Sequence, residues 1–379
     1  MPEAPTVMFA AGEESGDRHA ASVFRAMREQ LPGLRGIGMG GHHLREAGVD
    51  VRLDSTQIAV LGLGEVLRHY GKIRRALKTM QRMVCEEKPD LLICVDYKEF
   101  NLKLAQHAQQ CGVKVLFYVS PQVWAWRPGR VHKYGAAVDM MAVIFPFEVE
   151  FFERHDIPVR YVGHPLAGTV APSVSREAAM EEFGLDPDRP VVALMPGSRA
   201  NEIQRLMPVM VECARRIRER HPEAQFVLPQ AASVSDEALS AYLDSSPVPV
   251  TTIKGRTYDL LQCCDAAVTA SGTATLEVAM MGVPMAVTYK ISPFSYAIMS
   301  RLIRIPHIGL ANIVAGKEVV KEFVQKAARP EAIAEEINHI LEDEAYARRI
   351  QQDLADVSAR IGTESGVEKM ARLAVEMLE

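Results

Sequence analysis

The sequence of 379 residues contains no apolar run of about 18 residues, the length that a membrane-spanning helix needs. Its N-terminus also lacks the basic segment and the long apolar segment of a secretory signal. We therefore exclude a spanning helix and expect a cytoplasmic protein rather than a secreted one. Attachment to a membrane surface stays open, because an amphipathic helix suffices for it.

The six cysteines lack the spacing of a metal site or a redox pair. None form Cys-x-x-Cys, and no histidines stand at the spacing of a zinc site. Most lie in apolar runs, so we expect reduced, buried thiols. The cysteines are Cys85, Cys94, Cys111, Cys213, Cys263 and Cys264.

An excess of positive charge is missing as well. Lys and Arg total 43 against 48 Asp and Glu, a net charge of -5, so the chain has no overall attraction to nucleic acid. With 48% hydrophobic and 24% charged residues, the composition is that of a folded protein. The length fits two domains, each large enough to bury a core.

Short apolar runs alternate with segments of helical periodicity, a pattern typical of parallel sheets built from βαβ units. The expected strands are residues 6–10, 91–95, 115–119, 140–144, 159–162, 191–195, 225–228 and 266–269. A polar stretch separates two groups of strands, which predicts domains at 1–166 and 167–344. Helices at about 345–379 are expected to pack back on the first domain.

Ligand sites in such sheets lie in the loops after the strands. After residues 191–195 come Gly197, Ser198 and Arg199, a turn that opens a helix and offers backbone N–H groups and a cation to a phosphate. An ordinary strand-to-helix turn capped by Ser198 is the alternative.

A second loop of this kind follows residues 266–269, and two such loops in one domain suggest a diphosphate. Its hydroxyl and N–H groups belong to Ser271, Gly272, Thr273, Ala274 and Thr275. Glu277 lies about one turn into the next helix, where its carboxylate could accept hydrogen bonds from a ribose. It could equally complement the helix dipole.

In the first domain the equivalent βα turn is residues 10–17. The literal G-x-G-x-x-G string at 36–41 is discounted, because no adequate strand precedes it and a poor helix start follows. Asp96 ends the strand 91–95, a position suited to a general base, although it could simply cap the next helix. Glu99 is close enough in sequence to compete for that role.

Two further segments suit a sugar, a phosphate or a membrane surface. Both tryptophans, Trp124 and Trp126, lie among basic residues in the segment 123–134. Residues 63–84 form a helical apolar stripe with cations on the remaining face, which fits either an anionic membrane or ordinary packing on a sheet.

Together these strings closely resemble the lipid-A-disaccharide synthase family of bacterial glycosyltransferases. The strings that carry the resemblance are 11–17 (AGEESGD), 118–127 (YVSPQVWAWR), 145–148 (FPFE), 163–165 (GHP), 196–199 (PGSR) and 271–277 (SGTATLE), with Asn312, Glu322 and Gln325. The resemblance implies an α/β fold of the GT-B type, with two Rossmann-like domains and a deep cleft.

The same resemblance implies an inverting transfer from UDP-2,3-diacylglucosamine to 2,3-diacylglucosamine 1-phosphate (lipid X), without a metal ion or another cofactor. Asp96 and Arg199 match the base and the diphosphate cation, and Asn312, Glu322 and Gln325 join the UDP site. The acceptor-side residues are Glu14, Ser15, Asp17, Asn101, Trp126 and Arg127. A peripheral place on the cytoplasmic face of the inner membrane is implied, and a homo-oligomer is left open.

The chain departs from the family pattern on the acceptor side. Asp-x-Pro-Asp-Phe-Asn is replaced by residues 96–101 (DYKEFN), and Gly-Gly-Pro-x-Met by residues 40–44 (GGHHL). Two alternatives therefore stay open: an isomerase similar to UDP-N-acetylglucosamine 2-epimerase, and a UDP-sugar-binding relative with little transferase activity.

Overall fold

The computed structural model describes residues 4–57, 63–126, 128–231, 233–292, 296–297, 300–301 and 305–379, without the side chains of 57, 63–70, 126 and 128. The chain forms two units, Met1–Ala167 together with Thr363–Glu379, and Gly168–Gly362. Of the C-terminal helices, only the last one, after residue 362, belongs to the first unit. The sequence prediction had assigned all helices from about residue 345 to that unit.

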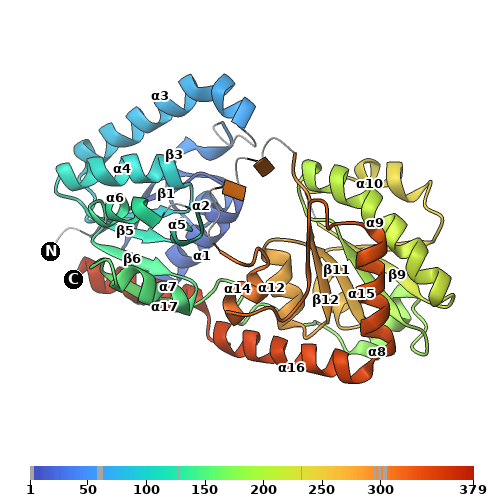
Figure 1. The fold of residues 1–379 in the computed structure, drawn as a ribbon. Coiled ribbons are helices and arrows are strands. Elements are labelled where there is room, and N and C mark those ends of the chain that lie inside the picture. Colours follow the sequence, from blue (N-terminus) through green and yellow to red (C-terminus); the bar gives the residue numbers. More distant parts are fainter. Residues whose placement is uncertain are drawn as a thin grey trace. The chain divides into compact units, whose positions relative to one another are not determined.

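Seven parallel strands form the sheet of the first unit, in the order β3-β2-β1-β4-β5-β6-β7 (Figure 1). Their bounds are β1 Thr6–Ala11, β2 Arg35–Gly40, β3 Asp50–Asp54, β4 Leu91–Val95, β5 Lys114–Tyr118, β6 Met140–Val143 and β7 Val159–Tyr161. The central strands are buried along their whole length, because helices cover both faces of the sheet.

Alternate side chains of these strands supply two cores. Met8, Leu92 and Phe117 point to the face covered by α3 and α4, whereas the Phe9 ring meets Phe24 of α1 edge-on on the other face, with 5.7 Å between the ring centroids. In Figure 1, α3 and α4 lie above the strands and α17 below them. The helices are α1 Glu14–Gln30, α2 His42–Glu46, α3 Leu63–Glu87, α4 Lys98–Gln110, α5 Val123–Trp126, α6 Val131–Gly135, α7 Pro146–Glu153 and α17 Gly366–Leu378.

Six parallel strands form the sheet of the second unit, in the order β10-β9-β8-β11-β12-β13. Their bounds are β8 Val191–Met195, β9 Gln225–Gln230, β10 Val250–Lys254, β11 Ala266–Ala270, β12 Met285–Tyr289 and β13 Glu322–Val324. The prediction of an α/β fold with two Rossmann-like domains is confirmed.

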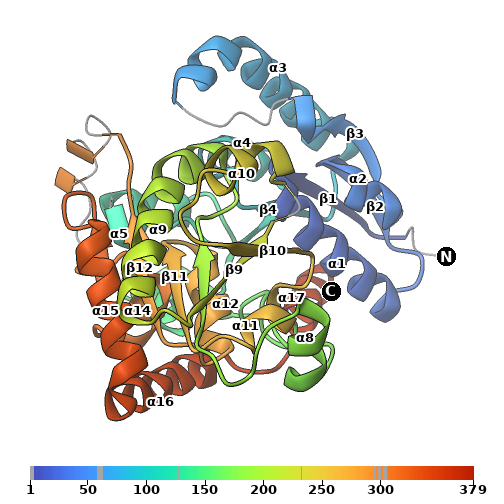
Figure 2. The ribbon, with the colours of Figure 1, turned by 90° about the vertical axis from the view of Figure 1, so that its right-hand side faces the viewer.

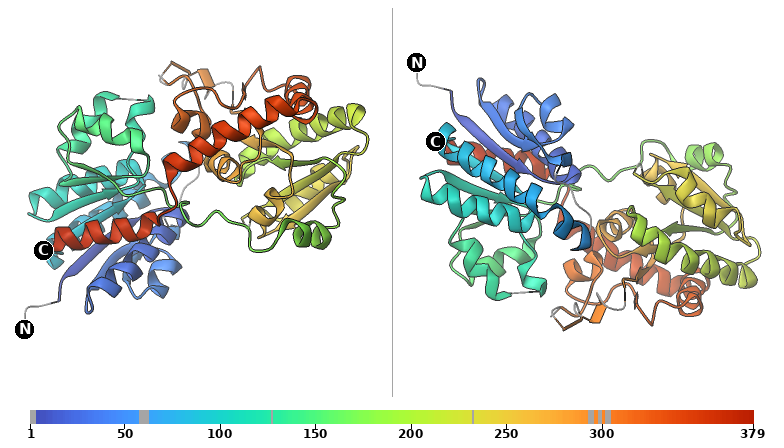
Figure 3. Two further views of the ribbon diagram at one scale, coloured as in Figure 1. Left: turned by 90° about the horizontal axis from the view of Figure 1, so that it is seen from below. Right: turned by 90° about the horizontal axis from the view of Figure 1, so that it is seen from above.

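Helices cover both faces of this second sheet too. α9 and α15 lie side by side over β11 (Figure 2), and α16, drawn in red, packs on α12 and α14 (Figure 3). The bounds are α8 Arg176–Phe183, α9 Ala200–Arg220, α10 Asp236–Leu243, α11 Thr257–Leu261, α12 Thr273–Met280, α14 Leu310–Ala315, α15 Pro330–Glu342 and α16 Glu344–Ile361.

All eight strands expected from the sequence are present, and the structure adds five, β2, β3, β10, β12 and β13. The discounted glycine string is β2 itself. Gly38 has a φ of +137°, and a Cβ there would lie 2.1 Å from the Phe9 carbonyl oxygen. Gly38 therefore serves close strand pairing, and the string forms a strand and not a phosphate turn.

The structure corrects the expectation of reduced, buried thiols for one cysteine pair. Cys85 and Cys111 are only half-buried and are joined as a disulfide, whereas Cys94, Cys213, Cys263 and Cys264 are free.

No helix in the described part of the chain combines the length and the apolar character that crossing a membrane requires.

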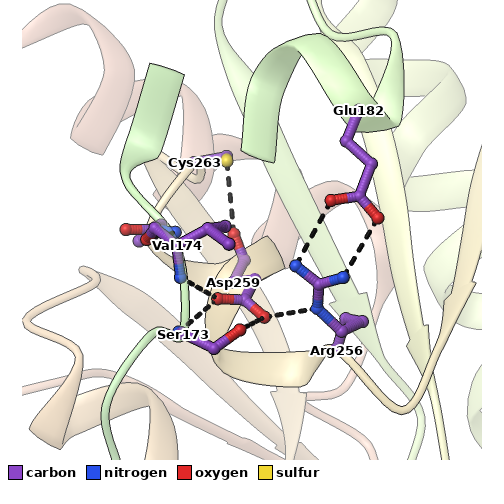
Figure 4. A network of polar contacts seen from close by, with 7 residues as sticks. Ser173, Val174, Glu182, Arg256, Asp259 and Cys263 are labelled. Carbon is purple, nitrogen blue, oxygen red and sulfur yellow. Dashed lines mark hydrogen bonds and ion pairs between the residues drawn. The ribbon is translucent and has the colours of Figure 1, made fainter. Parts of the chain in front are cut away.

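A buried carboxylate fixes the start of the second unit (Figure 4). Asp259 of α11 accepts hydrogen bonds from the backbone N–H groups of Ser173 and Val174, at 2.6 and 3.2 Å, and pairs with Arg256. Arg256 in turn forms a bidentate ion pair with Glu182 of α8. Burial raises the pKa of Asp259, but these hydrogen bonds outweigh it and hold the pKa at about 2.

We expect Asp259→Asn to lower the free energy of unfolding by about 2 to 4 kcal/mol at pH 7, because Arg256 loses a buried partner. The native pKa lies below the ordinary value of 3.8, so the ionised form stabilises the fold above about pH 4. The difference between wild type and variant should shrink as the pH falls from about 4 toward 2.

Urea titrations of wild type and Asp259→Asn between pH 7 and pH 3 measure the two free energies of unfolding. The control is Asp188→Asn, which changes an exposed carboxylate of the same unit. Equal stability of wild type and Asp259→Asn at pH 7 would contradict the anchoring role.

Candidate functional site

Each sheet contains a point where the strand order reverses. In the first sheet this point lies between β1 and β4, and in the second between β8 and β11. The loops that leave these neighbouring strands diverge to opposite faces, which opens a crevice at their carboxyl ends, the common ligand position in doubly wound sheets. The loops that the sequence analysis selected, which follow β1, β4, β8 and β11, are the loops at these two points.

A cavity of about 280 Å³ lies at the carboxyl ends of β8 and β11, within the second unit. Both predicted phosphate loops contribute to it. The predicted residues that line it are Gly197, Ser198, Arg199, Ser271, Gly272, Thr273, Ala274 and Glu277. Among the lining residues that were not predicted to bind a ligand are the polar side chains of Glu202 and Thr257.

The first loop is held by Glu202, which lies one turn into α9. Its carboxylate accepts hydrogen bonds from the N–H groups of Ser198 and Arg199, at 3.2 and 3.3 Å, and pairs with the Arg199 Nη1 atom at 2.9 Å. Gly197 has a φ of +100°, and a Cβ there would lie 2.2 Å from the Glu202 carboxylate. The two N–H groups are thus already engaged, and the exposed Arg199 guanidinium is the loop's principal cation.

The second loop uses its hydroxyls mainly to hold itself. Ser271 Oγ donates to the Ile308 carbonyl at 2.9 Å, and Thr275 Oγ1 donates to the Gly272 carbonyl at 2.8 Å and accepts from the Leu310 N–H at 3.1 Å. Thr273, by contrast, is exposed at the start of α12. The backbone of this helix start and Thr273 therefore face an incoming anion.

Glu277 lies where the cavity meets a second hollow of about 340 Å³, lined in part by Gly255, Thr257 and Tyr258. The Tyr258 hydroxyl donates to Glu277 Oε1 at 3.0 Å. Burial raises the pKa of Glu277, and the Tyr258 hydrogen bond lowers it in part. A carboxylate between two hollows suits a ligand that fills both.

Four predicted ligand residues, Thr275, Asn312, Glu322 and Gln325, are not in the wall of this cavity. Asn312 is fully buried and accepts hydrogen bonds from the N–H groups of Val319 and Val320. Glu322 accepts from Ile308, Gly309 and Asn312. These two residues hold the loop that supports Ser271 and Thr275.

Gln325 forms two hydrogen bonds with the backbone of Ile291 and lines a different hollow, beside Lys290 and Arg301.

The first unit holds Asp96 in a strained backbone conformation. Asp96 and Tyr97 have φ values of +48° and +44°, and the Tyr97 ring lies where a Cβ on Gly12 would be, 2.4 Å from its nearest atom. The Asn101 amide donates to the carbonyls of Asp96 and Ala10, at 2.8 and 3.0 Å. Asn101 is fully buried, so it positions Asp96 and the ends of β1 and β4.

The two candidate bases differ in their surroundings. Glu99 is paired through both carboxylate oxygens with Arg130, whereas the Asp96 carboxylate has no hydrogen-bond partner among the residues that the structure describes. The Arg130 guanidinium thus already occupies both carboxylate oxygens of Glu99. The geometry favours Asp96 over Glu99.

The predicted acceptor residues separate into two groups. Glu14 and Ser15 are exposed at the start of α1. Asp17 is 2% exposed, and its carboxylate accepts from the N–H groups of Gly41, His43 and Leu44, so it fastens α2 to α1. Arg127 and the Trp126 side chain lie outside the described residues.

Two further family strings, 118–127 and 145–148, contribute to a buried polar cluster. Glu148 is 1% exposed and accepts hydrogen bonds from Ser120, the Trp124 indole and the N–H groups of Ile144 and Phe145. Burial raises the pKa of this carboxyl, although its hydrogen bonds oppose the change. The cluster ties the loop after β5 to the start of α7, which is a structural role.

A family model described as lipid-A-disaccharide synthetase matches residues 7–377 of the chain. The chain is 50% identical over 372 residues to a lipid-A-disaccharide synthase of Geobacter sulfurreducens, which covers 98% of this chain and 97% of that protein. It is 46% identical over 377 residues to that of Nitrosococcus oceani, covering 99% and 97% of the two chains.

Solved structures with the same fold are more distant in sequence. A UDP-N-acetylglucosamine 2-epimerase of Neisseria meningitidis bound to UDP-GlcNAc is similar with a TM-score of 0.64 and 13% identity, over 98% of this chain and 99% of that one. A calicheamicin glycosyltransferase is similar with a TM-score of 0.61 and 16% identity, over 99% and 98%. At these identities the similarity shows the fold alone.

Proposed function

The chain belongs to the lipid-A-disaccharide synthase family and is a glycosyltransferase, and from this premise we propose its substrates, the residues that bind them and the base that activates the acceptor. Family membership gives a UDP-sugar and a lipid-linked substrate. We propose UDP-2,3-diacylglucosamine as donor and 2,3-diacylglucosamine 1-phosphate as acceptor. The acceptor 6-hydroxyl oxygen bonds to the donor C1, the bond from C1 to the diphosphate breaks, and UDP leaves.

The cavity at the ends of β8 and β11 supports the donor assignment most directly. Its two loops suit the two phosphates, and Glu277 suits the ribose at the border with the neighbouring hollow. Arg199 has five N–H donors, of which the Glu202 contact uses those of Nη1, so the guanidinium can hold Glu202 and a phosphate together.

Arg199 and the helix start of α12 offer positive charge where the leaving UDP accumulates negative charge. In this proposal the transfer needs no metal ion, since protein groups stabilise the diphosphate.

Asp96 is the proposed general base. A carboxylate at the end of β4, beside the strand reversal and free of an arginine partner, can accept the proton of the attacking hydroxyl. The strained backbone at Asp96 and Tyr97, held by Asn101, fits a site whose geometry is fixed before the substrate arrives.

The isomerase alternative rests on fold similarity at 13% identity, whereas the synthase relatives match nearly the whole chain at up to 50%. The matches therefore favour transfer over epimerisation.

We expect Asp96→Asn to lower kcat by about 10²- to 10⁴-fold, the usual contribution of general base catalysis, while UDP binding persists. The assay supplies both acylated sugars and measures UDP and disaccharide together. Wild type should form one disaccharide for each UDP.

The matched control is Glu99→Gln, which should keep most of the activity. An active Asp96→Asn variant would move the base elsewhere. UDP release by wild type without any disaccharide would overturn the proposed substrates.

Arg199→Ala should raise the Kd of UDP roughly tenfold to a hundredfold and lower the rate, because the diphosphate loses a charge-assisted contact. Arg199→Lys should recover only part of the loss, since ammonium cannot bind two oxygens as a fork. Calorimetric titration with UDP measures the Kd of both variants. Arg218→Ala, near the other end of α9, serves as control, and unchanged affinity in Arg199→Ala would rule out the diphosphate role.

We propose that α3 contacts the cytoplasmic face of the inner membrane, where the acylated substrates reside. From residue 71 onward, Ala76, Met80 and Val84 of this helix are buried against the sheet, so its apolar stripe there serves packing. The cations Lys72, Arg74, Arg75 and Lys78 are exposed and can attract anionic lipid.

Replacing these four cations by Gln should weaken binding to anionic vesicles at least about tenfold, because each contributes on the order of 1 kcal/mol near such a surface. Vesicle co-sedimentation measures the change. A control variant that neutralises the exposed residues Arg25, Arg35, Lys103 and Lys133 has the same net charge. An equal loss in both variants would show general charge attraction and not a contact through α3.

A further inference from the structure

Three side chains with metal-binding atoms meet on the first unit, outside the loops at the strand reversal. They are Cys85 near the end of α3, His107 in the last turn of α4 and Cys111 just after α4. Their ligand atoms all lie within 4.8 Å of one another. The His107 Nε2 atom lies 3.3 Å from Cys85 Sγ, and the Cα atoms of the two cysteines are 5.7 Å apart.

The packing of two helices holds this group together. α3 and α4 lie against each other on the same face of the sheet, and Met83, Val84 and Ala108 beside the group belong to the core. His107 and Cys111 are four residues apart, and the Cys111 N–H bonds to the His107 carbonyl, so both side chains point to the same side of the helix end. The backbone positions of the three ligands are therefore fixed.

We propose that Cys85, His107 and Cys111 of the reduced chain bind one thiophilic divalent cation, Zn²⁺ above all, with water as the fourth ligand. Two thiolates and a neutral imidazole are a common zinc ligand set, and the two thiolates balance the charge of the ion. A zinc ion with Zn–S bonds of about 2.3 Å needs the sulfurs about 3.8 Å apart. Rotation of a cysteine side chain about χ1 changes the distance between the sulfurs while the Cα atoms stay 5.7 Å apart.

The pair forms a disulfide in the structure, but three observations favour a metal in the reduced protein. A third ligand, His107, stands beside the sulfurs, and a disulfide has no need of it. All three side chains are half-buried, so an ion can reach them. A chain of 379 residues buries a large core, and its fold does not depend on a disulfide as that of a small secreted domain does.

Such an ion would fasten the end of α3 to the end of α4. α4 begins two residues after Asp96, and α3 carries the exposed cations Lys72 and Lys78. The ion would therefore stabilise the packing of the two helices that flank these features, with no part in the transfer reaction itself. Because the cysteine thiols and a protonated imidazole must lose their protons to bind the ion, the affinity for the metal should fall on acidification.

The test is a titration of the full-length chain with Co²⁺, after reduction and removal of metals by a chelator. We expect one Co²⁺ per chain, with the thiolate charge-transfer band and the visible bands of tetrahedral cobalt, and displacement by Zn²⁺. Cys85→Ser, Cys111→Ser and His107→Ala should each weaken binding at least about tenfold to a hundredfold. Cys264→Ser, which alters the other half-buried thiol, should bind as wild type does.

Circular dichroism of each metal-free variant checks that it folds, so that a lost spectrum reports the site and not the fold. If a variant fails to fold, the wild-type titration still decides, because the thiolate band requires cysteine ligands. A reduced, folded wild type that shows no such band would overturn the proposal. A pair that re-forms the disulfide in a glutathione buffer and excludes cobalt would overturn it as well, in favour of a redox pair.

Discussion

Both units depend on the parallel pairing of one strand with a partner far along the chain, β1 with β4 and β8 with β11. In each sheet this pairing reverses the strand order, so that the loops from the paired strands diverge. Asp96 and the residues around Gly12 stand at one reversal, and Arg199 and Thr273 at the other. The positions of the proposed base and of the proposed diphosphate cation thus follow from strand topology before any side-chain chemistry is considered.

Polar side chains that hydrogen-bond to the backbone convert these crevices into defined sites. Asn101, Glu202 and Glu322 each bind two or more backbone groups of a functional loop. Each of these side chains thereby restrains the loop that it binds, because its hydrogen bonds fix the positions of those backbone groups. Asn101 and Glu322, which belong to the family resemblance, therefore position loops of the site through the backbone.

Much of the fold was predictable from the sequence, because buried parallel strands such as residues 91–95 are continuous apolar runs. Three of the five strands that escaped prediction lack that signal. β2 is rich in glycine, and β3 and β10 have only partly buried or exposed residues, as edge strands do. The two loops that line the cavity were predictable from their position after strands, whereas the contacts of Glu202 were not, since only the folded loop brings its carboxylate to Ser198 and Arg199. The group of Cys85 and Cys111 was equally hidden, because 26 residues separate the two cysteines and helix packing alone unites them.

The first unit is discontinuous in sequence, and this has a consequence for biosynthesis. α17 packs on α1 and β4, yet it follows the entire second unit along the chain. During translation the second unit can complete its core as one continuous segment, whereas the first sheet waits for its last covering helix. A chain that ended at residue 362 would therefore hold every element of the unit that carries Arg199 and its cavity, but would lack the helix that completes the unit of Asp96.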